Sequence, residues 1–156
     1  MEDSQSSSTL DIRGLPRDLK RLKPLINLAA HAIFEQHKVA SFAISIAFVN
    51  DSKISKINRE SLGRDGPTDV IAFDLSEDGL PFEKVADIYV STDRASENSL
   101  RYGVSFEEEI LRLVIHGLLH VLGYRDDTVS SKRKMHRIQE QLVRRYLGGV
   151  KSRRNQ

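Results

Sequence analysis

The sequence predicts a single α+β domain in which a small β-sheet is flanked by helices. Residues 41–49 alternate between apolar and polar side chains, which is typical of a strand with one buried face. Near both ends of the chain, apolar residues recur at helical spacing instead. Strands in the middle of the chain, with helices before, between and after them, favour the α+β class. A length of 156 residues suits one hydrophobic core.

The first expected elements are a short strand over residues 10–13 and a helix over residues 24–34. The helix begins at Pro24, because a proline is tolerated in the first turn, where its missing N–H costs no hydrogen bond. An apolar stripe at helical spacing follows it. The strand over residues 41–49 comes next, with four apolar side chains on one face: Phe42, Ile44, Ile46 and Phe48.

The middle of the chain predicts a short helix and two further strands. The helix begins at Asp51 or Ser52, both of which are good N-cap residues, and it ends at the turn-rich loop 63–67. Residues 70–75 form an apolar run and residues 86–91 alternate, so we expect both segments to join the sheet.

The last third of the chain predicts three helices, the first over residues 92–102. Ser105 and Glu108 form a capping box that begins the second helix. This helix is apolar on nearly all its faces, as a helix in the core is, and Gly123 supplies its left-handed C-terminal stop. An apolar stripe over residues 135–146 marks the third helix. The expected total is about four strands and about five helices.

The chain divides into one domain and two short flanking segments. Residues 1–9 are acidic and rich in serine, so we expect a disordered N-terminal segment. Residues 10–148 form the domain, and residues 149–156 form a basic tail. No stretch approaches the roughly 20 apolar residues that span a bilayer, and we therefore expect no membrane partner.

The composition limits the kinds of site that this chain can build. The absence of cysteine excludes a disulfide scaffold, a thiolate zinc site and a cysteine nucleophile, and it fits a cytoplasmic protein. Any metal ion must be bound by imidazole and carboxylate groups. The formal net charge is +2, yet the basic residues crowd the last quarter of the chain. Two interpretations of this charge remain open, a solvated helix face or a contact with nucleic acid.

The most informative residues lie at the end of the apolar helix. His116 and His120 are four positions apart, so both imidazoles can point at one centre on the same helical face. Gly123 allows the chain to turn back, and Asp126 then returns to the same centre. Asp127 is the rival third ligand.

Two imidazoles and one carboxylate favour a single zinc ion. Zinc prefers four ligands, so three protein ligands leave one position for water, whose pKa zinc lowers to about 7. A structural site more often has four protein ligands. We interpret the other histidines, His31, His37 and His136, as helix-surface residues without a role at the metal.

At these residues the chain resembles the YbeY family of bacterial zinc-dependent rRNA maturation endoribonucleases. The motif of that family runs His-Gly-x-Leu-His-x-x-Gly-Tyr-Asp-His. The resemblance covers roughly residues 40–145 in three blocks with compatible spacing. The matching residues are His116, Gly117, Leu119, His120, Gly123 and Tyr124 in the motif, Asn58, Asp65, Pro67, Thr68, Asp69, Val70 and Phe73 in a second block, and Asp87, Ile88 and Ser91 in a third.

Three positions depart from the family pattern. Asp126 stands in place of the third histidine ligand, and carboxylate is a competent zinc ligand. Arg125 stands where the family has aspartate. Leu62 stands where many members have an arginine that helps at the active site, so that contribution is missing here unless Arg59 or Arg64 replaces it.

The resemblance implies a small mixed sheet flanked by helices, with zinc in a cleft. It also implies a single-strand-specific endoribonuclease that acts in 16S rRNA 3′-end maturation and ribosome quality control. The implied partners are the rRNA precursor and the small ribosomal subunit or its assembly proteins, without a nucleotide cofactor. Beyond the metal ligands, the residues identify no catalytic group.

Two other functions compete with the nuclease. A metzincin-like zinc peptidase has similar ligand spacing, but it needs a glutamate after the first histidine, and this chain has Gly117 there. Met135 lies on a helical core stripe, so we interpret it as packing rather than as a methionine turn. The second alternative is a ribosome-assembly factor in which the zinc is structural, and the departures at Leu62 and Arg125 favour this possibility.

Overall fold

The computed structural model of the chain describes residues 8–80 and 82–154, the last six of them by their backbone alone. Four strands and five α-helices are present in this described part, together with a short 3₁₀ turn at Arg17–Leu19. The strands are β1 (Thr9–Arg13), β2 (Ser41–Val49), β3 (Val70–Asp74) and β4 (Glu83–Ser91). The helices are α1 (Leu22–Gln36), α2 (Asp51–Leu62), α3 (Thr92–Tyr102), α4 (Phe106–Val121) and α5 (Val129–Arg154).

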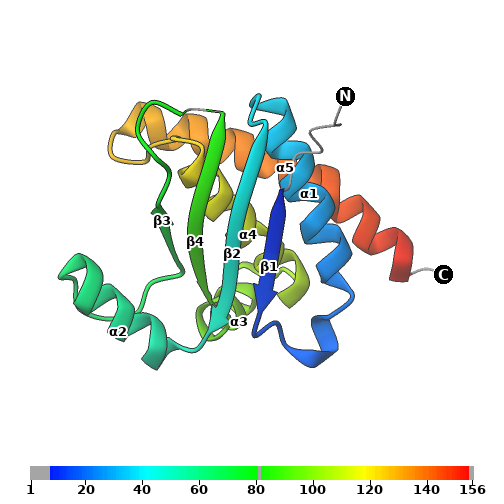
Figure 1. Cartoon of the computed structure of the whole chain (residues 1–156). Helices are drawn as coiled ribbons and strands as arrows, with labels where there is room; N and C mark the ends of the chain where they lie inside the picture. Colours follow the sequence, from blue (N-terminus) through cyan, green and yellow to red (C-terminus); the bar gives the residue numbers. More distant parts are fainter. Residues whose placement is uncertain (1–7, 81, 155–156) are drawn as a thin grey trace.

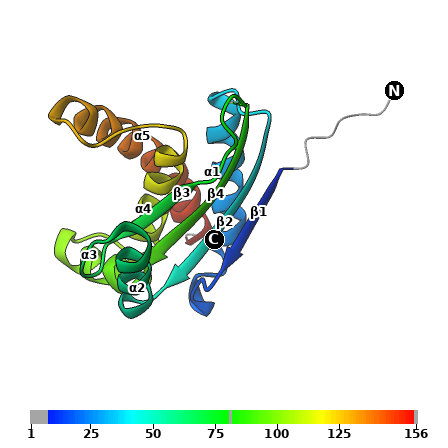
Figure 2. The ribbon, with the colours of Figure 1, turned by 60° about the vertical axis from the view of Figure 1, so that its left-hand side comes forward.

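The strands form one mixed sheet in the order β1-β2-β4-β3 (Figure 1). The three strands β1, β2 and β4 run parallel, and β3 pairs antiparallel to β4 at the edge. Helices α1, α4 and α5 lie on the same face of the sheet (Figure 2). The mixed sheet flanked by helices agrees with the expected α+β class.

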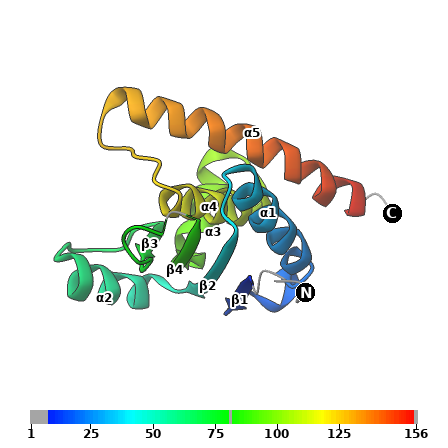
Figure 3. The ribbon, with the colours of Figure 1, turned by 45° about the horizontal axis from the view of Figure 1, so that its top comes forward.

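Helix α4 is the central element, because it lies between the sheet and α5 (Figure 3). Its apolar side chains are completely buried on several faces, among them Ile110, Leu111, Ile115 and Leu118. The Ser105 hydroxyl caps the helix by accepting a hydrogen bond from the Glu108 amide at 3.0 Å. The expected buried helix is therefore confirmed, with its N-cap at the expected residue.

Close packing of α4 on the sheet depends on Gly117. A Cβ atom at this position would lie 2.8 Å from the Ile88 Cγ2 atom and 3.2 Å from the Val70 Cγ1 atom. Those two residues belong to β4 and β3, so a glycine allows α4 to approach both strands. This approach places the C-terminal half of α4 beside the edge strand β3.

Some element boundaries differ from the expected ones. Strand β4 begins at Glu83 rather than at residue 86, because it pairs with β2 along nine residues, from Ser41 opposite Glu83 to Val49 opposite Ser91. Strand β3 ends one residue early, at Asp74.

The two chain ends also differ from expectation where they are described. Helix α5 begins at Val129 and continues to Arg154, so the described part of the expected basic tail is helical. Of the expected N-terminal segment, residues 1–7 lie outside the described residues, and Thr9 already pairs with Ala43 in the sheet. The domain limits 10–148 remain a prediction. Within the described residues, no helix combines the length and the apolar character needed to cross a membrane.

Candidate metal centre

The end of α4 and the turn after it position three candidate metal-binding side chains. His116 and His120 lie in the last two turns of α4, on the face that is partly open. Gly123 has a φ of +96°, and the Tyr124 amide donates a hydrogen bond to the Leu119 carbonyl at 3.1 Å. The chain therefore turns back directly after the helix, and Asp126 returns toward the two imidazoles.

The three ligand atoms converge as the spacing predicts. One ligand atom each from His116, His120 and Asp126 lies within 4.8 Å of the other two. The two Nε2 atoms are 3.0 Å apart, and the His120 Nε2 atom lies 3.4 Å from Asp126 Oδ2. The ligand atoms of a tetrahedral zinc ion with bonds of about 2.05 Å lie about 3.3 Å apart. The donor set and its spacing therefore fit a small divalent cation.

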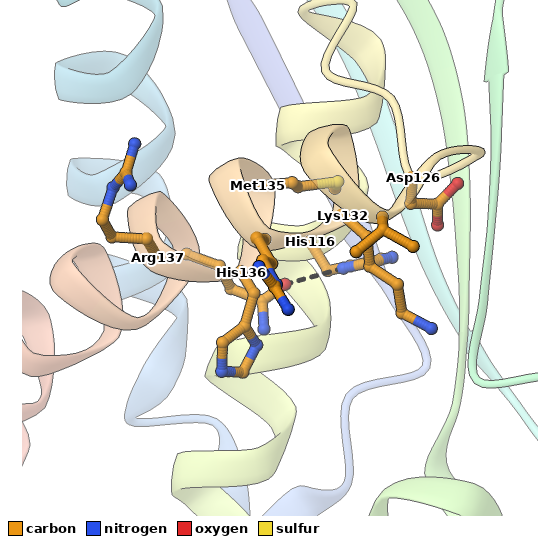
Figure 4. A pocket seen from close by; sticks show the side chains of 9 residues that line it. His116, Asp126, Lys132, Met135, His136 and Arg137 are labelled. Atoms are coloured by element: carbon orange, nitrogen blue, oxygen red, sulfur yellow. Dashed lines mark hydrogen bonds between the residues drawn. The ribbon is translucent and has the colours of Figure 1, made fainter.

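The second ring nitrogen of each imidazole, Nδ1, has a hydrogen-bond acceptor of its own. The His116 Nδ1 atom lies 2.6 Å from Gln139 Oε1, and the His120 Nδ1 atom lies 3.2 Å from the Tyr124 carbonyl oxygen. The dashed line at His116 in Figure 4 marks the first of these hydrogen bonds. An acceptor at this distance places the proton on Nδ1, which leaves the Nε2 lone pair free to bind a metal ion. The Gln139 amide is oriented in turn, because its Nε2 group donates to Glu140 at 3.2 Å.

Burial keeps His116 in the form that binds metal. Its removal from water lowers the pKa of the His116 imidazole, against the opposing effect of the hydrogen bond with Gln139. The charge of His120 also lowers this pKa, whereas Asp126 raises it. A neutral imidazole is the metal ligand, so the lowered pKa favours metal binding at neutral pH.

The structure distinguishes the two candidate aspartates. Asp126 faces His120. Asp127 Oδ2 instead pairs with the Arg125 guanidinium at 3.0 Å, and its Oδ1 atom accepts a hydrogen bond from Ser131 at 3.4 Å. Asp127 thus pairs with Arg125, one of the three residues that depart from the family pattern, and it is not part of the group of converging ligand atoms.

One histidine has a role that the sequence did not predict. His37 is half-buried, and its Nε2 atom accepts a hydrogen bond from the Tyr124 hydroxyl at 2.8 Å. Its Nδ1 group donates to the Ile33 carbonyl at 2.7 Å. The interpretation of His37 as a surface residue was therefore wrong. It connects α1 to the turn whose Tyr124 carbonyl holds His120, and the other two histidines, His31 and His136, are exposed as expected.

Gln139 was also missed, although the sequence carries a signal for it. It is a polar residue within the apolar stripe of α5, and it is 7% exposed. A buried polar side chain needs a hydrogen-bond partner, and that requirement points to a neighbouring polar group on α4. The partner itself, His116, lies 23 positions away and is not evident from the sequence.

A cleft of about 1010 Å³ runs from the candidate metal ligands across α4 toward β3 and α2. Leu62, which replaces the family arginine, lines it and is 45% exposed. Arg64 lines the same cleft, whereas Arg59 lines a separate depression on α2 and pairs with Asp65 at 3.6 Å. Of the two possible substitutes, Arg64 is therefore the better placed.

A charged cluster lies on the N-terminal half of α4, and two of its members, Glu109 and Arg112, line the same cleft. Arg112 contacts Glu108 and Glu140 at 2.9 Å and Glu109 at 3.6 Å. Burial raises the pKa of Glu109 to about 7, although the Arg112 charge lowers it, and the Asp69 charge adds to the rise. Hydrogen bonds from Arg112 and Gln139 lower the pKa of Glu140 against the effect of its burial. The Arg112 guanidinium is thus occupied by carboxylates.

The structure also bears on the peptidase alternative. The Cβ direction at Gly117 points at Ile88 and Val70 of the sheet, so a side chain there would face the core rather than the ligands. Met135 is 2% exposed and belongs to the hydrophobic core. Position 117 therefore has neither the residue nor the direction that a peptidase base requires.

Comparison with known proteins agrees with the family resemblance of the sequence motifs. The chain matches the protein family described as "Endoribonuclease YbeY" over residues 11–147. A relative of that description from Halalkalibacterium halodurans is 37% identical over 135 residues, which cover 80% of this chain and 84% of the relative. Another, from Bacillus licheniformis, is 36% identical over 141 residues, which cover 85% of this chain and 88% of the relative.

A solved structure confirms the predicted fold. The solution structure of TM1509 from Thermotoga maritima superposes with a TM-score of 0.68 at 27% sequence identity, and the match covers 93% of both chains. The four-stranded mixed sheet with its five helices is thus similar to an experimentally determined fold.

Proposed function

Because the chain belongs to the endoribonuclease YbeY family, we propose that it is a zinc-dependent enzyme that cuts single-stranded RNA by phosphodiester hydrolysis. We further propose that it acts in the cytoplasm in 16S rRNA 3′-end maturation and ribosome quality control, with the small ribosomal subunit or its assembly proteins as partners. The convergence of the His116, His120 and Asp126 ligand atoms within 4.8 Å carries the catalytic part of this proposal.

The residues of the site have separate tasks in the proposed reaction. His116 and His120 bind the ion through Nε2, and Asp126 completes a set of three protein ligands. Gln139 and the Tyr124 carbonyl keep the proton on each Nδ1 atom. A zinc ion bound there supplies a Lewis acid and a water molecule whose pKa is lowered to about 7. Basic side chains near the cleft hold the RNA backbone, so binding weakens as salt rises.

The test compares the zinc-loaded protein with a His116→Ala variant on single-stranded and duplex RNA of the same sequence. We expect the unchanged protein to cut the single strand, with the duplex cut more slowly, and a chelator to stop the reaction. The His116→Ala variant loses cleavage by more than about 1000-fold, because removal of a ligand removes both effects of the metal ion. A His31→Ala variant, changed at an exposed histidine of α1, serves as the matched control and keeps its activity.

The structural-zinc alternative remains testable in the same experiment. Two observations favour it, namely Leu62 in place of the family arginine and the occupation of Arg112 by carboxylates. It predicts that the purified protein retains zinc and binds RNA, while products accumulate equally with the unchanged protein and with His116→Ala. That result would remove the nuclease proposal.

A further inference from the structure

A second cavity lies on the α5 side of the candidate metal centre. It has a volume of about 470 Å³, within the range of sites that bind small ligands. Figure 4 shows it from close by, with His116, Asp126 and the first turns of α5 around it. It shares His116, Asp126 and Lys132 with the larger cleft, so the two hollows meet at the metal ligands.

The wall of this cavity combines apolar and basic groups. Val129 is 69% exposed at its rim, and the thioether of Met135 lies deeper, because Met135 is 2% exposed. Lys132, Arg133 and Arg137 also line it, and all three are exposed. Long basic side chains pack their methylene stems against apolar surface while their charged ends remain in water. An apolar wall with a cationic rim fits a flat ring that carries an anionic group.

The positive charge of this rim is not neutralised by neighbouring carboxylates. Among the described residues, no ion pair within 4.0 Å involves Lys132, Arg133 or Arg137. On the opposite side of the ligands, the guanidinium of Arg112 is occupied by Glu108, Glu109 and Glu140. Lys132 lines both hollows together with His116 and Asp126, so its charge is available for a phosphate beside these residues.

From this arrangement we propose that the α5 cavity binds one unpaired nucleotide of the RNA, next to the phosphate that is cut. Its base lies against Val129 and Met135, and Lys132 contacts the adjacent phosphate. The inference rests on the proposed function and adds a reason for single-strand specificity. A base within a duplex is stacked and paired, so it enters the cavity only after its removal from the helix, which costs a few kcal/mol.

The first experiment measures kcat and KM of zinc-loaded variants on a short fluorescent single-stranded RNA. Val129→Glu places a negative charge in the cavity, and Gln141→Glu, at an exposed position of α5 outside the cavity, is its matched control. We expect Val129→Glu to raise KM about tenfold, in line with the 1–3 kcal/mol of one stacked base, with unchanged zinc content. Lys132→Ala raises KM as well. Its control is Arg144→Ala, at an exposed basic residue farther along α5. Both controls, Arg144→Ala and Gln141→Glu, change KM less than about twofold.

A second experiment uses RNA that lacks one base at a time. If the base lies against Val129, the effect of Val129→Glu disappears when the abasic nucleotide occupies one particular position beside the cut. An effect of equal size for every abasic position contradicts the proposal, because it indicates general repulsion of the RNA. Equal KM values for Val129→Glu and Gln141→Glu contradict it too.

The outcomes distinguish this inference from the proposed function. If the unchanged protein cuts RNA and the cavity variants behave like their controls, the nuclease proposal stands and the nucleotide site fails. If the unchanged protein does not cut, RNA binding measured by fluorescence anisotropy with the same RNA tests the nucleotide site independently of cleavage. Weaker binding by Val129→Glu than by Gln141→Glu then supports it, and equal binding overturns it.

Discussion

The two halves of α4 carry two partly buried polar clusters, which differ in the kinds of group that they bring together. In the N-terminal half, Arg112 lies among Glu108, Glu109 and Glu140, so one cation pairs with three carboxyl groups. In the C-terminal half, His116, His120 and Asp126 bring electron-pair donors together, with two imidazole nitrogens 3.0 Å apart. Lone pairs at that distance repel one another unless a proton or a cation lies between them.

This difference leads us to expect that the first cluster stabilises the fold and that the second binds a metal ion. The Arg112 cluster pairs a cation with carboxyl groups of the protein, and its side chains tie α4 to α5 through Glu140. The histidine cluster is supported from outside by Gln139 and by the Tyr124 carbonyl, and its inner side has three donor groups that could bind a cation. Changes in the first cluster should therefore alter stability, and changes in the second should alter metal affinity.

The largest expected effect comes from Arg112→Met, which removes the cation from three carboxylates. We expect a loss of roughly 3–5 kcal/mol in the free energy of unfolding, because it leaves buried charges unpaired. Urea unfolding in the presence of a chelator measures this loss without a contribution from metal binding. The control is Arg101→Met, an exposed residue of α3, and an equal effect of both changes would contradict a structural role of the cluster.

Next in size is the effect of Asp126→Ala on the metal ion. We expect zinc affinity to fall by more than about 100-fold, because the loss of a direct ligand exceeds the 10–100-fold that an outer partner costs. Competition with a chromophoric chelator measures the affinity. The matched variant Asp127→Ala removes the neighbouring carboxylate, which pairs with Arg125, and should leave the affinity nearly unchanged. The opposite ranking would identify Asp127 as the ligand.

The raised pKa of Glu109 predicts a pH dependence of stability. Its pKa rises from 4.5 to about 7 on folding, so between these values the folded protein binds a proton that the unfolded chain has released. Stability therefore falls as pH increases through this window, by at most about 3 kcal/mol. Glu109→Gln, which imitates the protonated group, should make the profile flatter between pH 4.5 and 7. Parallel profiles of the two proteins would refute the assignment.

The smallest effect is expected at His37, which contacts the turn between the candidate ligands through Tyr124. His37→Phe keeps a ring but removes the acceptor of the Tyr124 hydroxyl, so the turn that holds His120 and Asp126 is less well positioned. We expect a loss of roughly tenfold in zinc affinity, the lower end of the range for outer partners. Tyr124→Phe should have the same effect, and the double variant no more than either. His31 makes the same kind of bond to a carbonyl four residues earlier, so His31→Phe is the control.

Most of the helices and the convergence of the three candidate ligands could be predicted because their signals are local. The capping residue Ser105, the apolar faces of α4 and the stop at Gly123 lie within one segment, and the i, i+4 spacing of His116 and His120 follows from helix geometry. The length of β4 could not be predicted from its own residues, since its first residues are held by pairing with β2. The extension of α5 through residues 149–154 was not evident from a local pattern either.

The sequence by itself determined the class of fold, the buried helix and a group of donors that can meet beyond its end, because each depends on neighbours a few positions apart. The tertiary structure decided what surrounds those donors. Gln139 reaches His116 across 23 positions, and His37 reaches Tyr124 across 87, so both contacts exist only where α5 and α1 pack beside α4. Packing also brings Asp126 rather than Asp127 beside His120, and among the described residues it leaves Lys132, Arg133 and Arg137 without an ion pair, since each outcome depends on which side chains become neighbours in space.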